Sequence, residues 1–174
     1  MKHLKGAQGV ELVPMGASDL ENVRRWRNQE HVRQHFEYDQ VITAEMQQAW
    51  WQRLDLDRNC YWVLRVNGKG IGVLHCKDID WGERVGEVGI FIGEAEYLGT
   101  PYPLIAIPLI FEYLFRKLNL SCLLSKVKAS SIGNIELNLR LGFELVEEGD
   151  FGKYRLLRKQ FEEGVAAGRY FGLQ

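Results

Sequence analysis

The chain of 174 residues is poor in cysteine and proline and has almost no net charge. Its three cysteines, Cys60, Cys76 and Cys122, are widely spaced and include no Cys-x-x-Cys pair, so we expect reduced, mostly buried thiols in a cytoplasmic protein. With 22 basic and 23 acidic residues, no overall field attracts nucleic acid or a membrane surface. We therefore expect a small-molecule partner, and neither nucleic acid nor membrane.

Long hydrophobic runs and metal-binding patterns are also missing. The longest apolar run, residues 104–111, is too short to span a bilayer, and residues 1–6 lack the apolar stretch typical of a signal peptide. His31 and His35 share one helix face, but no glutamate lies between them in a zincin arrangement and no third ligand is evident. We expect a cytoplasmic protein without a metal.

The patterns that are present predict alternating strands and helices. The expected strands cover residues 10–13, 61–66, 70–75, 86–93, 122–127, 143–147 and 154–157, and the expected helices begin at Ser18 and Thr43 and cover residues 104–120, 131–141 and 158–167. Ser18 starts a capping box, Asn67-Gly68 forms a hairpin turn, and Gly142 ends a helix. This order predicts one α+β domain over residues 1–174, with a mixed, mostly antiparallel central sheet of six to seven strands and about four flanking helices.

The segment from residue 86 to residue 120 carries the first functional indication. A β-branched strand runs into a glycine-containing turn and then into an apolar helix, and this geometry gathers backbone N–H groups around a phosphate. Pro101 and Pro103 lie in the turn and supply no N–H donor. The segment predicts a phosphorylated cofactor and a reduced set of donors for it.

The element order, with Leu141-Gly142-Phe143 after the fourth main helix, resembles the GCN5-related N-acetyltransferase (GNAT) superfamily over essentially the whole chain. Residues 26–33, Trp-Arg-Asn-Gln-Glu-His-Val-Arg, resemble the Trp-Arg-Asn…Val-Arg motif of one branch of this superfamily. Residues 42–45 and Trp50 match the same branch, although Gln47 occupies a position where that branch has His. The branch includes the UDP-4-amino-sugar N-acetyltransferases of pseudaminic acid synthesis and lies near the ribosomal-protein N-acetyltransferases.

The resemblance implies an acyl-CoA N-acyltransferase fold and direct transfer of acetyl from acetyl-CoA to a primary amine. The implied acceptor is a nucleotide-linked amino sugar. A protein N-terminus or a polyamine is the alternative acceptor, and a degenerate CoA-binding or regulatory module is the alternative class. A nucleotide sugar requires basic contacts, whereas a polyamine or peptide amine favours carboxylates.

The residues implied to contact the acceptor are Trp26, Arg27, Asn28, Arg33 and Asp80. Arginine suits a diphosphate because its planar fork binds phosphate bidentately. Each residue also has a structural alternative: a core aromatic for Trp26, a capping or solvated role for the polar residues, and an Asp-Trp-Gly turn for Asp80.

The family's pantetheine arm pairs with the free edge of a strand, here around Phe91 and Ile92, which splays from the strand at residues 122–127. Residues 96–101 match the family's pyrophosphate-loop motif only at Gly99. The backbone N–H groups that remain to bind a pyrophosphate are those of Leu98, Gly99, Thr100 and Tyr102. In the expected helix at residues 131–141, the resemblance places Ser131 and Asn134 at the family's cofactor-binding positions.

The implied catalytic residues are Glu87, Asn138 and His75. Aminolysis needs a neutral amine, and Glu87 on a central strand is the leading base or water-orienting group, with an ion-pair role as the alternative. Asn138 stands where the family's tyrosine protonates the departing thiolate, so it offers a hydrogen bond but no proton. A backbone N–H near Ile92 is the expected donor to the thioester carbonyl.

The apolar tail, residues 170–173, either packs on its own domain or covers a partner in a homodimer.

Overall fold

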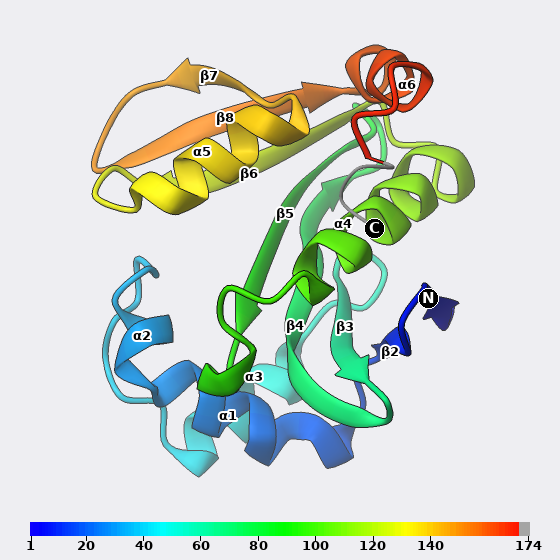
Figure 1. Cartoon of the computed structure of the whole chain (residues 1–174). Helices are drawn as coiled ribbons and strands as arrows, with labels where there is room; N and C mark the ends of the chain where they lie inside the picture. The colour runs from blue at the N-terminus through cyan, green and yellow to red at the C-terminus, as the bar shows by residue number, and fades with distance from the viewer. Residues whose placement is uncertain (171–174) are drawn as a thin grey trace.

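The computed structural model describes residues 1–170 and contains one eight-stranded sheet with the order β1-β2-β3-β4-β5-β6-β8-β7 (Figure 1). The strands are β1 (Leu4–Lys5), β2 (Val10–Pro14), β3 (Cys60–Val66), β4 (Lys69–Asp80), β5 (Val85–Ile92), β6 (Cys122–Lys128), β7 (Glu144–Glu147) and β8 (Phe151–Leu157). The helices are α1 (Leu20–Asn28), α2 (Glu30–Arg33), α3 (Ala44–Arg53), α4 (Tyr102–Glu112), α5 (Ile132–Leu141) and α6 (Arg158–Ala166).

The predicted α+β fold with a mixed, mostly antiparallel sheet is confirmed, because β5 and β6 form the one parallel pair of neighbours in the described sheet. The predicted counts were slightly low. The short strand β1 adds an edge to the sheet, and the first predicted helix divides into α1 and α2 at Gln29, whose backbone is extended. A wide π-helical turn, Tyr113–Lys117, continues α4.

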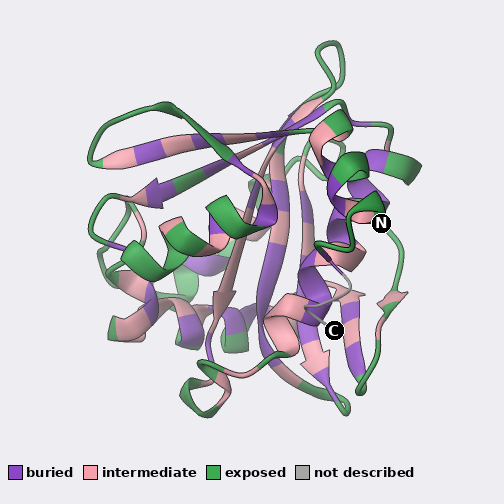
Figure 2. Ribbon diagram, turned by 45° about the horizontal axis from the view of Figure 1, so that its top comes forward, coloured by how far each residue is buried: buried purple, intermediate pink, exposed green. Residues whose placement is uncertain are grey.

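Alternating side chains along the strands build a core on each face of the sheet, and Figure 2 shows this alternation of buried and intermediate positions. Leu64, Leu74 and Val88 point to the face covered by α4, α5 and α6. Val63 and Val73, one residue away, point to the face covered by α1 and α3. The sheet therefore separates two sets of helices.

Most local sequence signals have the expected outcome. Asn67 and Gly68 both have positive φ, 49° and 82°, as a two-residue hairpin turn requires. The Thr43 hydroxyl accepts the Met46 N–H at 3.2 Å, and Gly142 ends α5 at φ 94°. The prediction of a capping box at Ser18 was wrong. The Asp19 carboxylate accepts the Gly16 N–H instead, and a 3₁₀ turn precedes α1.

The parallel pairing of β5 with β6 is short. It joins residues Val85–Glu87 to Cys122–Leu124, and then β5 continues with β4 while β6 continues with β8. Figure 1 shows the two strands side by side at one end and diverging toward α2. We call this divergence the fork, formed by residues 88–92 of β5 and residues 125–128 of β6.

The three cysteines are free and buried, as predicted. Burial is the main cause that raises the pKa of the Cys76 thiol. At the C-terminal end, Tyr170 is buried and its hydroxyl donates to the Leu141 carbonyl at 2.7 Å, so this part of the tail packs on its own domain. Residues 171–173 of the predicted apolar tail lie outside the described residues. In the described part of the chain, no helix has the length and apolar character needed to cross a membrane.

Candidate active site

The β5 side of the fork presents backbone groups to the space between the strands. The Gly93 N–H donates to the Ile71 carbonyl at 2.8 Å, so the peptide groups at Gly93 and Phe91 face β4. Consecutive peptide groups of a strand point to opposite sides, so the N–H and C=O groups of Ile90 and the N–H of Ile92 face the fork. No strand of the described chain pairs with them there.

This register refines the predicted cofactor-binding strand. Ile92 stays a candidate, but the backbone of Phe91 belongs to the β4 ladder and its ring packs edge-on against Phe36 at 5.7 Å. Sequence reasoning missed Ile90. The alternation of strand residues was the available signal, because Ile90 has the same orientation as Ile92.

At the inner end of the fork, Glu87 is the last β5 residue paired with β6. Its side chain lies on the α1–α3 face, and its Oε1 is 2.9 Å from the Lys77 Nζ directly across on β4. The predicted base is therefore present at the inner end and partly buried, but it belongs to an ion pair. An ion-paired carboxylate is better suited to orient a water than to remove a proton directly.

The opposite face of the inner end carries two buried polar side chains. Asn138 of α5 donates its Nδ2–H to the Ser125 Oγ of β6 at 3.0 Å, and both residues are nearly inaccessible to solvent. Asn138 is thus a buried residue and does not face solvent. Sequence reasoning missed Ser125, because its position matters only through the point at which the β5–β6 ladder stops.

His75 is poorly suited to the predicted catalytic role. Burial, with smaller contributions from Lys77 and Arg27, lowers the pKa of its imidazole to about 3, so the ring is neutral and weakly basic at neutral pH. It stacks near the Tyr61 ring at 5.4 Å and covers Gly89, where an added Cβ would lie 2.5 Å from the ring. These contacts give His75 a structural role.

At the outer end of the fork, some N–H groups of the expected phosphate loop donate to carbonyls of the loop itself. The Leu98 N–H donates to the Ala95 carbonyl at 3.1 Å, and the Thr100 N–H and hydroxyl both reach the Tyr97 carbonyl. The N–H groups of Gly99 and Tyr102 have no backbone acceptor within residues 1–170. Gly99 has φ +73°, a conformation that favours glycine.

Helix α2 and the turn that follows it connect the two sides of the fork at this outer end. The His31 Nε2 lies 3.2 Å from the Ile92 carbonyl, and the His35 Nδ1 lies 2.6 Å from the Ser131 Oγ at the start of α5. Ser131 is buried, whereas Asn134 in the next turn is exposed. Ser131, the predicted cofactor-binding residue at the start of α5, is thus occupied by His35, and Asn134 stays a prediction.

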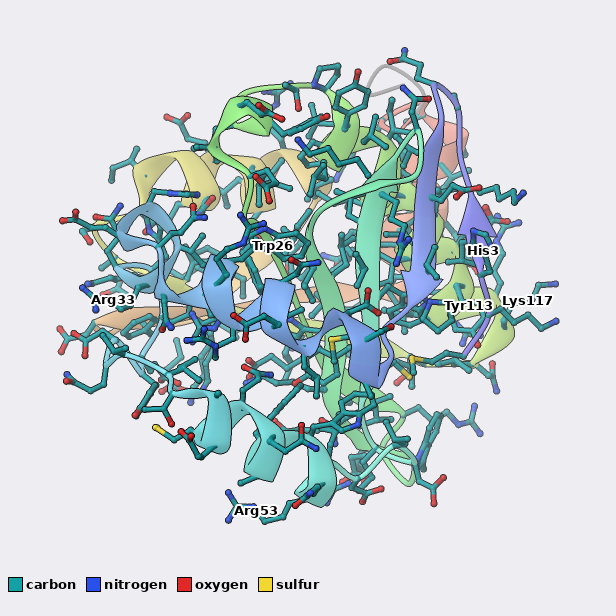
Figure 3. All side chains as sticks on the ribbon, turned by 90° about the horizontal axis from the view of Figure 1, so that it is seen from below. His3, Trp26, Arg33, Arg53, Tyr113 and Lys117 are labelled. Atoms are coloured by element: carbon teal, nitrogen blue, oxygen red, sulfur yellow. The ribbon has the colours of Figure 1, made fainter. Side chains whose placement is uncertain are left out.

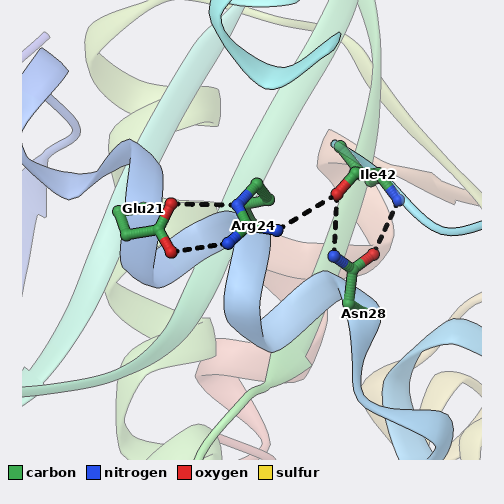
Figure 4. Close-up of polar contacts among 4 residues, drawn as sticks. All are labelled: Glu21, Arg24, Asn28 and Ile42. Carbon is green, nitrogen blue, oxygen red and sulfur yellow. Dashed lines mark hydrogen bonds and ion pairs between the residues drawn. The ribbon is translucent and has the colours of Figure 1, made fainter. Parts of the chain in front are cut away.

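Two of the predicted acceptor-binding residues have structural roles instead. Trp26 is buried and its indole N–H donates to the Glu94 carboxylate at 2.7 Å. Asn28 uses both ends of its amide on the backbone of Ile42, which fixes the loop before α3 (Figure 4). Nearby, Arg24 pairs with Glu21 and also reaches the Ile42 carbonyl.

Asp80 makes the turn that was its structural alternative, because its Oδ1 accepts the Glu83 N–H at 2.9 Å. Arg33 lies at the periphery of the molecule, as Figure 3 shows, whereas Trp26 lies near the centre of the same view. Neither Asp80 nor Arg33 is brought together with Glu87 by any described contact.

Arg27 stays a candidate for binding the acceptor. Its guanidinium carbon lies 3.4 Å from the centroid of the Phe36 ring, and its Nη1 is buried without a hydrogen-bond partner among the described residues. Burial lowers the pKa of Arg27 to about 10, partly offset by Tyr61. A buried cationic donor without a partner is costly, so this group favours an anionic or hydrogen-bond-accepting ligand.

An open hollow of about 570 Å³ adjoins Lys77 on the α1–α3 face. Its lining mixes aromatic, acidic and basic residues: Trp50, Arg53, Leu54, Asp55, Arg58, Asn59, Tyr61, Lys77 and Asp78. Burial is the main cause that raises the pKa of Tyr61 to about 12, so its hydroxyl is protonated and available as a donor. No local sequence pattern predicted this set, to which α3, the loop after it, β3 and β4 contribute.

A family model described as an acetyltransferase (GNAT) domain matches residues 10–144. A domain from Methanocaldococcus jannaschii is 19% identical, with a TM-score of 0.76 over 88% of this chain and 99% of that one. Spermidine N-acetyltransferase from Vibrio cholerae, in complex with CoA and spermine, is 20% identical, with a TM-score of 0.78 over 88% and 98%. A dodecameric structure of the same enzyme is 18% identical, with a TM-score of 0.72 over 88% and 96%. These identities show a shared fold, and a comparison with curated proteins gives no match.

Proposed function

This chain belongs to the GNAT acetyltransferase family, and we propose that it transfers an acetyl group from acetyl-CoA to the primary amine of a small molecule. The observation that carries the proposal is the fork, where a strand edge stands open beside a buried polar pair and a carboxylate. The phosphate loop and the strand edge lie in the order that an extended acyl-CoA needs.

Each part of the fork has a definite task in this proposal. Ile90 and Ile92 offer backbone groups to the pantetheine amides, and the N–H groups of Gly99 and Tyr102 bind the pyrophosphate. Glu87 orients the water that accepts a proton from the amine, since the ion pair with Lys77 holds its carboxylate in place at the inner end of the fork. Acetyl-CoA supplies the activated acyl group, and no covalent enzyme intermediate is required.

A polyamine is the first candidate acceptor. The similar Vibrio cholerae structures are described as spermidine N-acetyltransferases, and one contains spermine. The hollow beside Lys77 offers Asp55 and Asp78 as carboxylates, and Trp50 and Tyr61 as aromatic faces for an ammonium group.

An amine that also carries an anionic group, such as a nucleotide-linked amino sugar, is the second candidate. The unpartnered Nη1 of Arg27 favours it, and the branch resemblance of residues 26–33 motivates it. The basic residues Arg53 and Arg58 in the hollow add to this case.

The proposal is tested in two steps. First, acetyl-CoA should raise the melting temperature, because a ligand of the native state stabilises it. Second, CoA release is measured with spermidine, a UDP-linked 4-amino sugar and a short peptide with a free N-terminus. We expect the highest kcat/KM for spermidine. A higher value for the sugar would establish the second candidate, and a melting shift without CoA release from any amine would identify a non-catalytic CoA-binding module.

A further inference from the structure

Ser125 occupies the inner corner of the fork. The β5–β6 ladder ends at the pair Glu87 and Leu124, so Ser125 is the first β6 residue without a β5 partner. Its side chain is buried on the α5 face, on the same side as Leu123 and Val127 of the core. Glu87 points to the other face, so the two polar side chains flank the corner from opposite sides.

The Ser125 hydroxyl accepts a hydrogen bond but does not donate one to a described residue. Its Oγ accepts the Asn138 Nδ2–H at 3.0 Å, and the hydroxyl proton has no acceptor among the described residues. A buried hydroxyl normally uses its donor, because an unused donor loses its hydrogen bond to water on burial. Asn138 fixes the position of the hydroxyl and leaves its O–H for a group that enters the fork.

The direction in which acetyl-CoA lies follows from the loop and the strand edge. The Gly99 and Tyr102 N–H groups lie beyond the outer end of β5, so a cofactor held there by its phosphates extends inward along Ile92 and Ile90. From Ile92 to Val88 the strand covers about 13 Å, at roughly 3.3 Å per residue. The sulfur at the far end of the arm then lies at the inner corner, beside Ser125.

We propose that the Ser125 hydroxyl, positioned by Asn138, donates the hydrogen bond that stabilises the departing CoA thiolate, an inference that rests on the function proposed above. The amine nitrogen forms a bond to the thioester carbon, the C–S bond breaks, and its electron pair goes to sulfur. The proton of the attacking nitrogen goes to water oriented by Glu87. Ser125 keeps its own proton, and solvent protonates the thiolate after release. Ser125 thus replaces the phenol that the family places at the position of Asn138.

The test measures the bound thiol as well as turnover. The thiolate absorbance of CoA bound to the protein is titrated against pH in the wild type and in Ser125→Ala. A hydrogen bond to sulfur favours the thiolate, so Ser125→Ala should raise the pKa of bound CoA by about one unit. The same variant should lower kcat about ten- to hundredfold while KM for acetyl-CoA stays within about twofold.

Three variants separate this role from a structural one. Ser125→Thr keeps the hydroxyl and should restore the thiolate pKa, and Asn138→Leu, which removes the positioning bond, should give an intermediate value. Ser121→Ala removes an exposed serine just before β6 and should match the wild type. Melting temperatures show whether each variant is folded.

The outcomes distinguish the two proposals. An unchanged thiolate pKa in folded Ser125→Ala that binds CoA would overturn the role of Ser125 and leave the acetyltransferase proposal intact. Failure of the wild type to bind CoA would overturn both. A raised pKa together with the kcat loss supports both.

Discussion

At the inner end of the fork, Glu87 and Ser125 flank the corner from opposite faces, and each is already held by a partner, Lys77 and Asn138. At the outer end, Pro101 lies in the loop before α4 and Pro103 lies in the first turn of α4, and the N–H groups of Leu98 and Thr100 donate to carbonyls of the loop itself. In the proposed acetyltransferase, the end of the fork that would hold the reacting groups is therefore more completely built than the end that would bind the phosphates. We infer that acetyl-CoA binding depends more on the β5 edge than on the pyrophosphate loop.

A pair of proline substitutions gives the largest expected effect on this comparison. In Ile90→Pro the lost N–H faces the fork, so the β4–β5 ladder should survive while acetyl-CoA affinity falls at least about tenfold. In Phe91→Pro the lost N–H belongs to the ladder, and the domain should lose about 3 kcal/mol of stability or fail to fold. Calorimetric binding and thermal melts measure both. Equal acetyl-CoA affinity in the wild type and Ile90→Pro would refute the importance of the strand edge.

Acid should weaken the inner end. The folded pKa of His75 is about 3, below the 6.5 of an unperturbed histidine, so between these values the unfolded chain binds the extra proton. This contribution to stability is complete above about pH 6.5 and is lost as pH falls toward 3, by as much as about 4 kcal/mol. His75→Gln should flatten the slope of unfolding free energy against pH over this window.

His3→Gln is the matched control, because His3 is exposed near the N-terminus. It should leave the slope unchanged. A slope that persists in His75→Gln would assign the acid sensitivity to other groups.

The outer end should respond more weakly. Gly99→Ala places a Cβ on a residue with φ +73° and should cost about 1 kcal/mol, with a several-fold increase in KM for acetyl-CoA. Gly133→Ala serves as the control, because that glycine has open space around its Cα and no positive φ. A larger KM effect for Gly99→Ala than for Ile90→Pro would reverse the comparison between strand edge and loop.

The smallest expected effect concerns the loop's charge. Glu96 pairs with Lys69 at the surface, and Glu96→Gln removes a negative charge from the loop and releases the lysine. We expect a two- to threefold lower Kd for acetyl-CoA at low salt, and a smaller gain at high salt because exposed charges are screened. Glu162→Gln on the exposed side of α6 should show no such gain.

Local chemistry explains which parts of the fold could be predicted from sequence. Short sequence patterns predicted three features: the Asn67-Gly68 turn, the Thr43 N-cap and the helix end at Gly142. Each feature depends on residues within one turn of each other. The break between α1 and α2 could not be predicted, because no glycine or proline lies near Gln29 in the sequence.

The site was less predictable because its positions depend on strand register. Glu87 was identified because a carboxylate inside an apolar strand is conspicuous in the sequence, and its partner Lys77 follows from the pairing of β4 with β5. Ser125 and Ile90 are ordinary strand residues by pattern, and they matter only because the parallel ladder stops at Leu124. Trp26 and Asn28 illustrate the reverse case, since residues that carried the family resemblance turn out to hold the fold together.

Amide hydrogen exchange along β5, measured with and without acetyl-CoA, tests the central claim most directly. The fork predicts that acetyl-CoA protects the amides of Ile90 and Ile92, while Phe91 and Gly93, already bonded toward β4, change little. Protection confined to the loop at Gly99 and Tyr102, with exchange at Ile90 and Ile92 unchanged by saturating acetyl-CoA, would contradict the account.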